Sequence, residues 1–362
     1  MIIGNLVVQN RGGLSCWGGS CIGNTVVDNL AGIRSDNAVL LRNTIESNHY
    51  HGIWMDGGTA ASNLILGNGG QGVYVEYGAV INNRIIGNSD SGVVSQAPRL
   101  LISGNLIAGN GRVNSPLGGG VYYCGRNPDN QAILLCNTIV GNRSIRGGGV
   151  ACGSGSLEAI NCVLAHNRAS EGPEIAVWGQ TYDNGQASVS YSLLRITQGS
   201  IFTSGGSVTL GPGNIDADPL FVDPGHWDDG GTPDDTSDDK FILGDYHLLP
   251  GSPCIDAGTN DVDNPATPEI ETLPATDLAG LPRVIDGNLD STATVDIGAY
   301  EFLPGDVNYD GRVNILDLIA IRGSLNQDPT SSLAARKADA NADGRVNIED
   351  LIFVRNRLGK DR

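Results

Sequence analysis

Residues 63–95 read NLILGNGGQGVYVEYGAVINNRIIGNSDSGVVS and contain the same unit almost twice over. Each copy has the pattern Asn-x-Ile-x-x-Asn followed by Gly-Val, and the second copy begins 20 residues after the first. Apolar residues at every second position, such as Val73 and Val75, are typical of a β-strand, while the Gly and Asn residues between the runs favour turns. The stretch therefore predicts short strands that repeat every 20 residues.

The pattern recurs through the first half of the chain. With Ile, Val or Leu at its third position, and after a partial copy at Asn5, it begins at Asn24, Asn43, Asn63, Asn83, Asn105, Asn137 and Asn161. The early steps are 19, 20, 20 and 22 residues, and the later steps of 32 and 24 residues contain additional turn-forming residues. Such repeats predict a solenoid whose parallel coils are stacked about 4.8 Å apart.

Asparagines at equal points of successive coils can form amide ladders, because Asn tolerates the left-handed conformation of a turn. One predicted ladder consists of Asn48, Asn68, Asn88, Asn110, Asn142 and Asn167, and the other of the Asn residues that open the copies. The N-x-I-x-x-N-x-x-x-G-I repeat resembles the right-handed parallel β-helix family over roughly residues 1–200. We therefore expect a mainly β fold, with a right-handed parallel β-helix over residues 1–213 and a small α-helical module after it.

Charge divides the chain into three parts. The 22 basic and 40 acidic residues give a net charge of −18, which disfavours nucleic acid as a partner. Residues 1–200 hold eleven bases and eleven acids, and residues 306–362 hold nine of each, so all of the excess lies between them. No apolar run approaches the roughly 18 residues of a membrane span. Met1 opens inside a repeat without a signal peptide, so we expect a truncated start of a secreted or surface protein.

One outward face of the solenoid gathers rings and carboxylates. In the strands that follow each Gly, the first and third residues point inward and the second and fourth outward. The second positions place in one column Arg34, Trp54, Tyr74 and Tyr122. The fourth positions place beside them Asp36, Asp56 and Glu76. Aromatic rings beside carboxylates are suited to carbohydrate, so the first column is the candidate sugar-binding surface.

The same face provides candidates for catalysis. Asp56 and Glu76 on neighbouring coils would lie about 5 Å apart, near the separation of a retaining glycosidase pair. Repulsion between them favours a proton on one of them or a shared Ca²⁺, and polysaccharide lyases of the similar fold hold calcium with carboxylates on adjacent coils. His51, with His49, Tyr74 or Arg34 as alternatives, is the candidate base. Packing between coils, sugar binding and catalysis all remain open.

The seven cysteines do not have the spacing of a zinc site. Cys16 with Cys21, Cys124 with Cys136 and Cys152 with Cys162 recur at similar offsets, and Cys254 is left over. Disulfides that hold loops and a reduced, buried set of thiols are both compatible with this pattern.

Residues 214–304 form an acidic segment with the phrases DADPLFVDP, DYHLLPGSPCIDAG and VDIGAYEF. They resemble the choice-of-anchor Q region that ends many bacterial surface β-helix proteins. We expect this segment to cap the last coil and cover its open edge. Its Asp228–Asp239 loop is either a Ca²⁺ site or a solvated acidic loop.

Two loops near the C-terminus carry the strongest chemical signal. DVNYDGRVNILD (306–317) and DANADGRVNIED (339–350) have the oxygen-ligand spacing and the Gly of an EF-hand loop, and an apolar helical run follows each. The candidate ligands of one Ca²⁺ are Asp306, Asn308, Asp310, the Arg312 carbonyl, Asn314 and Asp317. Those of a second are Asp339, Asn341, Asp343, the Arg345 carbonyl, Asn347 and Asp350.

Leu303-Pro304-Gly305 precedes the first loop, so no helix enters it. This duplicated half-hand resembles the type I dockerin over residues 305–362, and the resemblance implies a cohesin partner. Cohesin contacts are implied near loop positions 10 and 11, which here are Ile315-Leu316 and Ile348-Glu349 in place of the family's Ser/Thr pairs.

Three functions remain open. The first is a noncatalytic carbohydrate-binding or scaffold component tethered through the dockerin. The second is a polysaccharide lyase or glycoside hydrolase, because dockerins usually carry plant-polysaccharide enzymes into assemblies. The third is a purely structural surface protein with the solenoid as a spacer.

Overall fold

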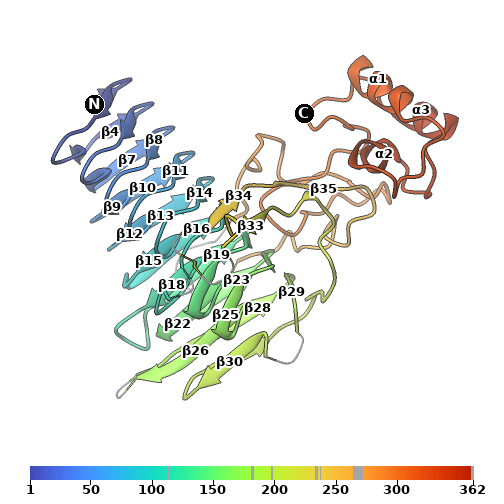
Figure 1. Ribbon diagram of the computed structural model, residues 1–362. Coiled ribbons are helices and arrows are strands. Elements are labelled where there is room, and N and C mark those ends of the chain that lie inside the picture. Colours follow the sequence, from blue (N-terminus) through green and yellow to red (C-terminus); the bar gives the residue numbers. More distant parts are fainter. Residues whose placement is uncertain are drawn as a thin grey trace.

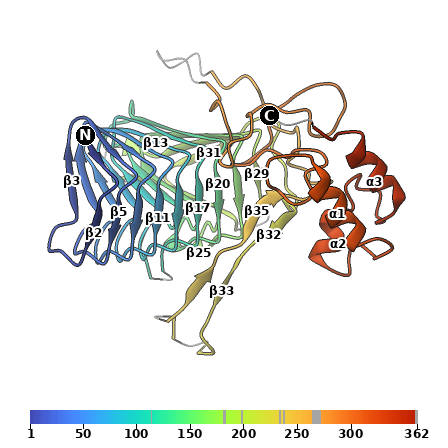
Figure 2. The ribbon, with the colours of Figure 1, turned by 90° about the horizontal axis from the view of Figure 1, so that it is seen from above.

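The computed structural model describes residues 1–112, 114–180, 183–196, 199–232, 235–236, 238–263 and 272–359. Three parallel sheets wind around one apolar core and form the predicted solenoid, with the N-terminus at one end (Figures 1 and 2). The acidic segment lies beside the solenoid, and a small helical module follows it (Figure 1). The mainly β solenoid fold with C-terminal helices is confirmed.

Each coil contributes one strand to each sheet. Sheet A runs in the order β1 (Ile2–Ile3), β4 (Ser20–Ile22), β7 (Ala38–Leu41), β10 (Gly58–Ala61), β13 (Gly78–Ile81), β16 (Arg99–Ser103), β19 (Gln131–Leu135), β23 (Ser156–Ile160), β28 (Gln186–Ser190) and β31 (Ser207–Leu210). Sheet B comprises β2 (Leu6–Val8), β5 (Thr25–Val27), β8 (Thr44–Glu46), β11 (Leu64–Leu66), β14 (Arg84–Ile86), β17 (Leu106–Ala108), β20 (Thr138–Val140), β24 (Val163–Ala165) and β29 (Leu193–Leu194). Sheet C comprises β3 (Leu14–Trp17), β6 (Ile33–Asp36), β9 (Ile53–Met55), β12 (Val73–Val75), β15 (Val93–Ser95), β18 (Val121–Cys124), β22 (Val150–Ser154), β26 (Ile175–Gln180) and β30 (Ile201–Ser204).

Smaller pairings complete the strands. They are β21 (Arg143–Arg146) with β25 (Arg168–Glu171), β26 with β27 (Asp183–Asn184), β32 (Phe221–Asp223) with β35 (Asp245–Leu248), and β33 (His226–Asp228) with β34 (Lys240–Ile242). The pairing of β21 with β25 is parallel, and the other three are antiparallel.

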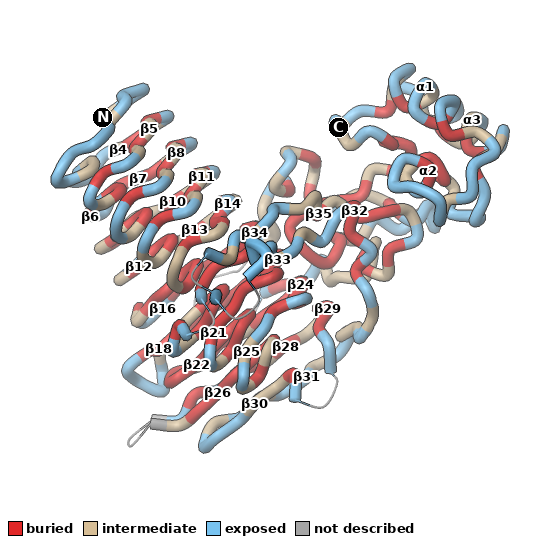
Figure 3. Tube along the Cα trace, viewed as in Figure 1, coloured by how far each residue is buried: buried red, intermediate tan, exposed pale blue. Residues whose placement is uncertain are grey.

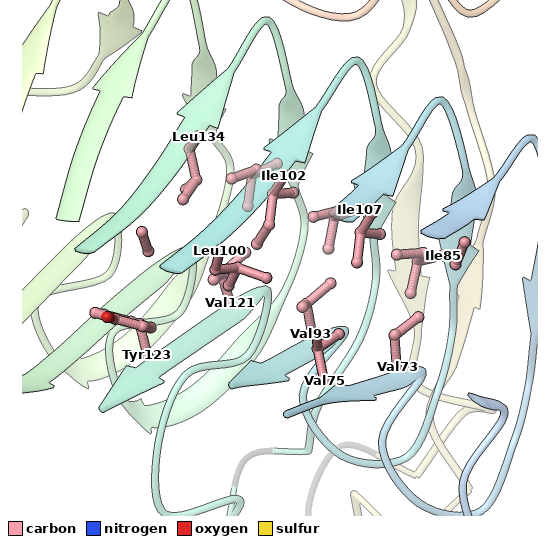
Figure 4. Packing of buried hydrophobic residues seen from close by; sticks show 14 of the residues in the cluster. Val73, Val75, Ile85, Val93, Leu100, Ile102, Ile107, Val121, Tyr123 and Leu134 are labelled. Carbon is pink, nitrogen blue, oxygen red and sulfur yellow. The ribbon is translucent and has the colours of Figure 1, made fainter. Parts of the chain in front are cut away.

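The core lies between the three sheets because the strand alternation sends every second side chain inward. Ile85 and Ile107 of sheet B face Val93 of sheet C and Ile102 of sheet A, and all four are fully buried (Figures 3 and 4). Aliphatic side chains at equal points of successive coils stack on one another, so the core is continuous along the solenoid.

The predicted asparagine ladder is present and longer than expected. The side-chain oxygen of Asn88 accepts the backbone N–H of Asn68 at 3.0 Å and its side-chain Nδ2 at 2.9 Å. The same pair of bonds links each ladder residue to the next from Asn29 to Asn167, and Asn10 joins through its backbone N–H. Each buried amide therefore pairs with a neighbouring coil, as burial of polar groups requires.

Both ladders end differently from the prediction. The second runs from Asn5 to Asn137, whose backbone N–H then approaches the Cys162 thiol at 3.4 Å. Asn161 was expected in this ladder but lies one residue too early, and it instead exchanges two hydrogen bonds with Thr259. The first ladder ends at Glu174, whose carboxylate accepts Asn167 Nδ2 at 2.6 Å.

All seven cysteines, which the structure describes, are buried, and no disulfide joins them. Cys16, Cys21, Cys152 and Cys162 belong to the solenoid core, and Cys254 of the acidic segment packs in the apolar cluster between that segment and sheet B. The structure therefore has the reduced, buried set rather than disulfides between loops.

The acidic segment packs along the outer face of sheet B, and at its start Ile215 forms a parallel bridge with Leu193 of β29. That the segment caps the last coil stays a prediction. Outward side chains such as Leu106 and Val163 form one cluster with Phe221, Tyr246 and Phe302. These outward positions of sheet B are apolar, and they need a cover along the flank of the solenoid.

A buried ionic group holds the end of the acidic segment together. Arg283 is 2% exposed, lies 3.3 Å from the Glu301 carboxylate and donates to the carbonyls of Asp296 and Gly298. The Asp277 carboxylate accepts the backbone N–H groups of Leu281 and Glu301. Removing one partner of such a buried group is strongly destabilising. The group therefore favours a single arrangement of the backbone segments to which its members belong.

The C-terminal module contains α1 (Ile315–Gly323), α2 (Leu333–Ala338) and α3 (Ile348–Arg355) around their own small core. Each calcium-type loop leads directly into a helix, and Asn314 and Asn347 cap α1 and α3. No helix precedes the first loop in the part of the chain that the structure describes, as predicted from Leu303-Pro304-Gly305.

We predict that Asn88→Ala lowers the free energy of unfolding of the solenoid by about 3 kcal/mol. The change leaves two donors of Asn68 buried without an acceptor, and each such group costs about 1–3 kcal/mol. Urea denaturation measures the loss. Asn127→Ala, at an exposed turn of the same solenoid, is the control and should change stability by about 0.5 kcal/mol at most; equal effects of the two variants would contradict the ladder.

A second prediction concerns Glu174. Burial raises the pKa of Glu174 to about 7, above its ordinary value of 4.5. A raised pKa in the folded state means that this carboxyl stabilises the fold fully below pH 4.5 and loses that contribution as the pH rises through 7. Glu174→Gln should abolish this loss of stability. At pH 8 the free energy of unfolding of the variant should therefore exceed that of the wild type by up to about 3 kcal/mol. Urea denaturation at pH 5 and pH 8 tests it, and identical pH dependence in both proteins would be inconsistent with it.

Candidate functional site

Sheet C carries an outward column of flat side chains. Arg34 on β6, Trp54 on β9 and Tyr74 on β12 occupy paired positions of adjacent strands. The rings of Trp54 and Tyr74 have centroids 4.6 Å apart and are tilted by 38°. Both rings are half-buried, so one part of each packs on the solenoid and the rest faces solvent. These three residues are the aromatic face.

Trp17 extends this face and was missed in the sequence. It is 63% exposed, and the Arg34 guanidinium lies 5.7 Å from the Trp17 ring and 6.0 Å from the Trp54 ring. Arg34 therefore lies between two indoles, an arrangement that cation–π attraction favours. The signal was available, because Trp17 is the fourth residue of a strand one coil before Asp36.

Side chains of the aromatic face bind the carboxylates of Asp56 and Glu76 beside it. Trp54 Nε1 donates to Asp56 at 3.0 Å, and the Tyr74 hydroxyl donates to Glu76 at 3.0 Å. Arg34 lies 3.8 Å from the second oxygen of Asp56. Burial and the neighbouring Glu76 raise the pKa of Tyr74, so its hydroxyl remains a proton donor. Each carboxylate thus has a fixed orientation and keeps lone pairs for a ligand.

Tyr122 does not belong to the aromatic face. Val94 lies between it and Tyr74 in the column, and Tyr122 is paired with Trp178, with ring centroids 6.0 Å apart. Burial raises the pKa of Tyr122. It packs with Ala151 and Ala176 in a separate apolar cluster, which has the character of packing between coils.

The ring of the candidate base His51 makes an edge contact with the ring of Trp54, and the two centroids lie 5.3 Å apart. Burial lowers the pKa of His51, so its imidazole is neutral at pH 7. No hydrogen bond joins His51 to Asp56 or Glu76, all three of which the structure describes. The His49 ring contacts the ring of Tyr50, and their centroids lie 4.9 Å apart.

The first calcium-type loop is organised around two buried carboxylates. Asp306 accepts the backbone N–H groups of Asp310 at 3.2 Å and Gly311 at 2.8 Å. Asp317 accepts those of Val307, Asn308 and Asn314 at 2.9, 3.1 and 2.8 Å. Gly311 has a φ of 81°, the left-handed value that the sharp turn requires.

The second loop repeats this arrangement. Asp339 accepts the N–H groups of Asp343 and Gly344 at 3.1 and 3.0 Å, and Asp350 accepts those of Asn341 and Asn347 at 3.2 and 2.8 Å. In both loops the Asn at position 9 uses its side-chain oxygen as the cap of the following helix.

The donor set of each loop fits a hard cation. Burial and the nearby Asp317 raise the pKa of Asp306 to about 6, and burial also raises the pKa of Asp317, Asp339 and Asp350. In the described residues no ion pair offsets any of these four carboxylates. Their side chains bond the loop backbone, and no described group of three or more Asp, Glu, His or Cys is gathered as metal ligands. Calcium would supply the missing positive charge to oxygen donors.

The Asp228–Asp239 loop is held by other contacts. Asp239 forms an ion pair with Arg143, whose guanidinium lies 3.9 Å from the Trp227 ring centroid. Asp238 accepts the Thr232 hydroxyl, and Asp228 accepts the Gly230 N–H. Asp234 lies outside the described residues, and a further Ca²⁺ at this loop stays a prediction.

The helices after the loops expose apolar side chains. Ile315, Leu316 and Ile319 around the start of α1 are 61%, 53% and 57% exposed, and Ile348 and Ile352 of α3 are 62% and 41% exposed. Two apolar patches at corresponding places of a duplicated module are a candidate surface for a protein partner.

Comparison with known proteins finds family matches for two regions of the chain. Residues 304–359 match the dockerin type I domain, and residues 32–184 match the right handed beta helix region. No curated protein and no solved structure matches the chain.

These matches carry consequences for partner, ion and location. Type I dockerins bind calcium and imply a cohesin partner, and they are typical of extracellular or cell-surface proteins. None of the described helices is long and apolar enough to cross a membrane. The chain therefore contains a right-handed β-helix region over residues 32–184 and a type I dockerin domain over residues 304–359.

Proposed function

We propose that this protein is a noncatalytic component that binds polysaccharide on its β-helix and is held in a cohesin-based assembly by its dockerin. The stacked Trp54–Tyr74 pair carries the proposal, because its half-exposed rings lie beside carboxylates of fixed orientation. Rings stack on the C–H faces of sugars, while carboxylates accept hydrogen bonds from hydroxyls.

The charge of this surface favours neutral sugars. Asp36, Asp56 and Glu76 lie along the aromatic face, and Arg34 is the one cation in the paired column. Arg126 also lies close enough to act on the Tyr74 hydroxyl, so acidic polysaccharides would meet one excess negative charge there, and like charges at an interface oppose association. We expect neutral oligosaccharides to bind and uronic acid oligosaccharides to bind more weakly.

The bonds to the carboxylates favour binding over catalysis. A general acid or nucleophile must reach the reacting atom of the substrate, whereas Asp56 and Glu76 are each fixed by the ring two residues earlier. The alternative of a polysaccharide lyase or glycoside hydrolase requires product formation that is lost in Asp56→Ala or Glu76→Ala.

We predict that Trp54→Ala weakens the binding of a neutral oligosaccharide at least about tenfold, which corresponds to about 1.4 kcal/mol. Isothermal titration calorimetry with neutral and uronic oligosaccharides measures the change. Tyr50→Ala, which removes a 51% exposed ring outside the aromatic face, is the matched control. Equal binding by the wild type and Trp54→Ala would reject this surface as the sugar site.

We further propose that the dockerin holds two calcium ions. In the first loop Asp306, Asn308, Asp310 and Asp317 provide side-chain oxygens and Arg312 its carbonyl. In the second loop Asp339, Asn341, Asp343 and Asp350 do so with the Arg345 carbonyl. Asn314 and Asn347 act through a bridging water, because their side-chain oxygens already cap the helices.

Removal of calcium should melt the dockerin before the β-helix. The module has a small core of its own, so bound ions should contribute much of its stability. Differential scanning calorimetry with EDTA should show the dockerin transition at lower temperature and the solenoid transition unchanged. A melting curve that EDTA leaves unaltered would refute the proposed sites.

A further inference from the structure

The dockerin is packed against the acidic segment through its first loop. Tyr309, at loop position 4, donates its hydroxyl to the Leu248 carbonyl at 3.1 Å. Its ring centroid lies 5.2 Å from that of His247 on β35, which in turn lies 4.4 Å from the Tyr300 ring.

Charged groups close the same contact. The Lys337 ammonium of α2 lies 4.6 Å above the Tyr309 ring and 3.9 Å from the Asp245 carboxylate. Asp245 also contacts His247 Nδ1 at 2.6 Å. We call Tyr309, Lys337, Asp245, His247 and Tyr300 the docking contact. Stacking, a cation–π contact and an ion pair act together here, so the contact has a defined geometry rather than that of a loose linker.

The docking contact is directly joined to a calcium loop. Tyr309 lies between Asn308 and Asp310, two of the proposed ligands, and has a left-handed φ of 60°. A bound ion that fixes its two neighbours also fixes the position of this ring. The equivalent residue of the second loop is Ala342, with a φ of 57°. Its methyl group lies near Gly251 of the acidic segment, but it has no ring to insert. The two loops thus have equivalent candidate calcium ligands, but they differ in the side chain that each presents to the acidic segment.

We propose that the docking contact couples calcium in the first loop to attachment of the dockerin to the β-helix. This rests on the proposed calcium sites. Docking raises the calcium affinity of the first loop, and by linkage calcium in that loop strengthens docking to the same degree. The second loop, which lacks the ring, binds calcium without this contribution.

The coupling also determines what a cohesin meets. Figure 1 places α2 toward the acidic segment and α1 and α3 on the outer side of the module. The exposed Ile315 and Ile348 therefore remain accessible while the dockerin is docked. Calcium would then hold the cohesin surface at a fixed orientation to the aromatic face.

Calcium titration of the full chain by calorimetry tests the coupling. We expect two affinities in the wild type, and His247→Ala should weaken one of them at least about fivefold. His247 lies outside both loops, so its effect must pass through the docking contact. His226→Ala, at an exposed position on β33, should change neither affinity. Lys337→Met is a second variant on the dockerin side, and it should weaken the same site as His247→Ala.

A distance measurement provides an independent readout. With spin labels on the solenoid and on α3, we expect a narrow distribution of distances between the labels with calcium and a broad one after EDTA. In Tyr309→Ala the distribution should be broad under both conditions. Unchanged affinities in His247→Ala and Lys337→Met would overturn the coupling while leaving the calcium sites intact. Absence of calcium binding in the wild type would overturn the calcium sites themselves, and the coupling with them.

Discussion

Hydrogen bonds between equivalent asparagines of successive coils are the constraint on which the structure depends. One amide oxygen accepts both the backbone N–H and the side-chain Nδ2 of the preceding ladder residue, so the register of two coils cannot slip without leaving buried donors unpaired. The constraint acts only at the turn, and the chain elsewhere can lengthen. Asn105 therefore bonds Asn137 across a 32-residue step as it would across a 20-residue step.

The same register creates the candidate binding surface. Because the coils are in line, outward positions of adjacent strands form columns, and a ring on one coil meets a ring on the next. Trp54 and Tyr74 then orient Asp56 and Glu76 through the polar ends of their rings. A surface built in this way is rigid before any ligand arrives, which reduces the entropy lost on binding.

The acidic segment uses its charge to join the two domains. It carries 20 of the acids and only two bases, Lys240 and Arg283. Asp239 pairs with Arg143 of the solenoid, and Asp245 pairs with Lys337 of the dockerin. Apolar burial against sheet B supplies the area of contact, and these ion pairs contribute to its geometry. The segment therefore connects the proposed sugar surface to the dockerin as a structural element rather than as a linker.

The sequence by itself determined the repeat, its strands, the first ladder and the two calcium-type loops, because each depends on a local pattern that recurs at fixed spacing. Only the tertiary structure decided that Cys162 replaces Asn161, that Tyr122 joins Trp178, that Trp17 lies beside Arg34, and that apolar residues of the acidic segment cover sheet B. It also decided that Tyr309 of the first loop meets His247. These outcomes depend on contacts between residues far apart in the chain, where side-chain volume and desolvation select the partner and periodicity carries no information.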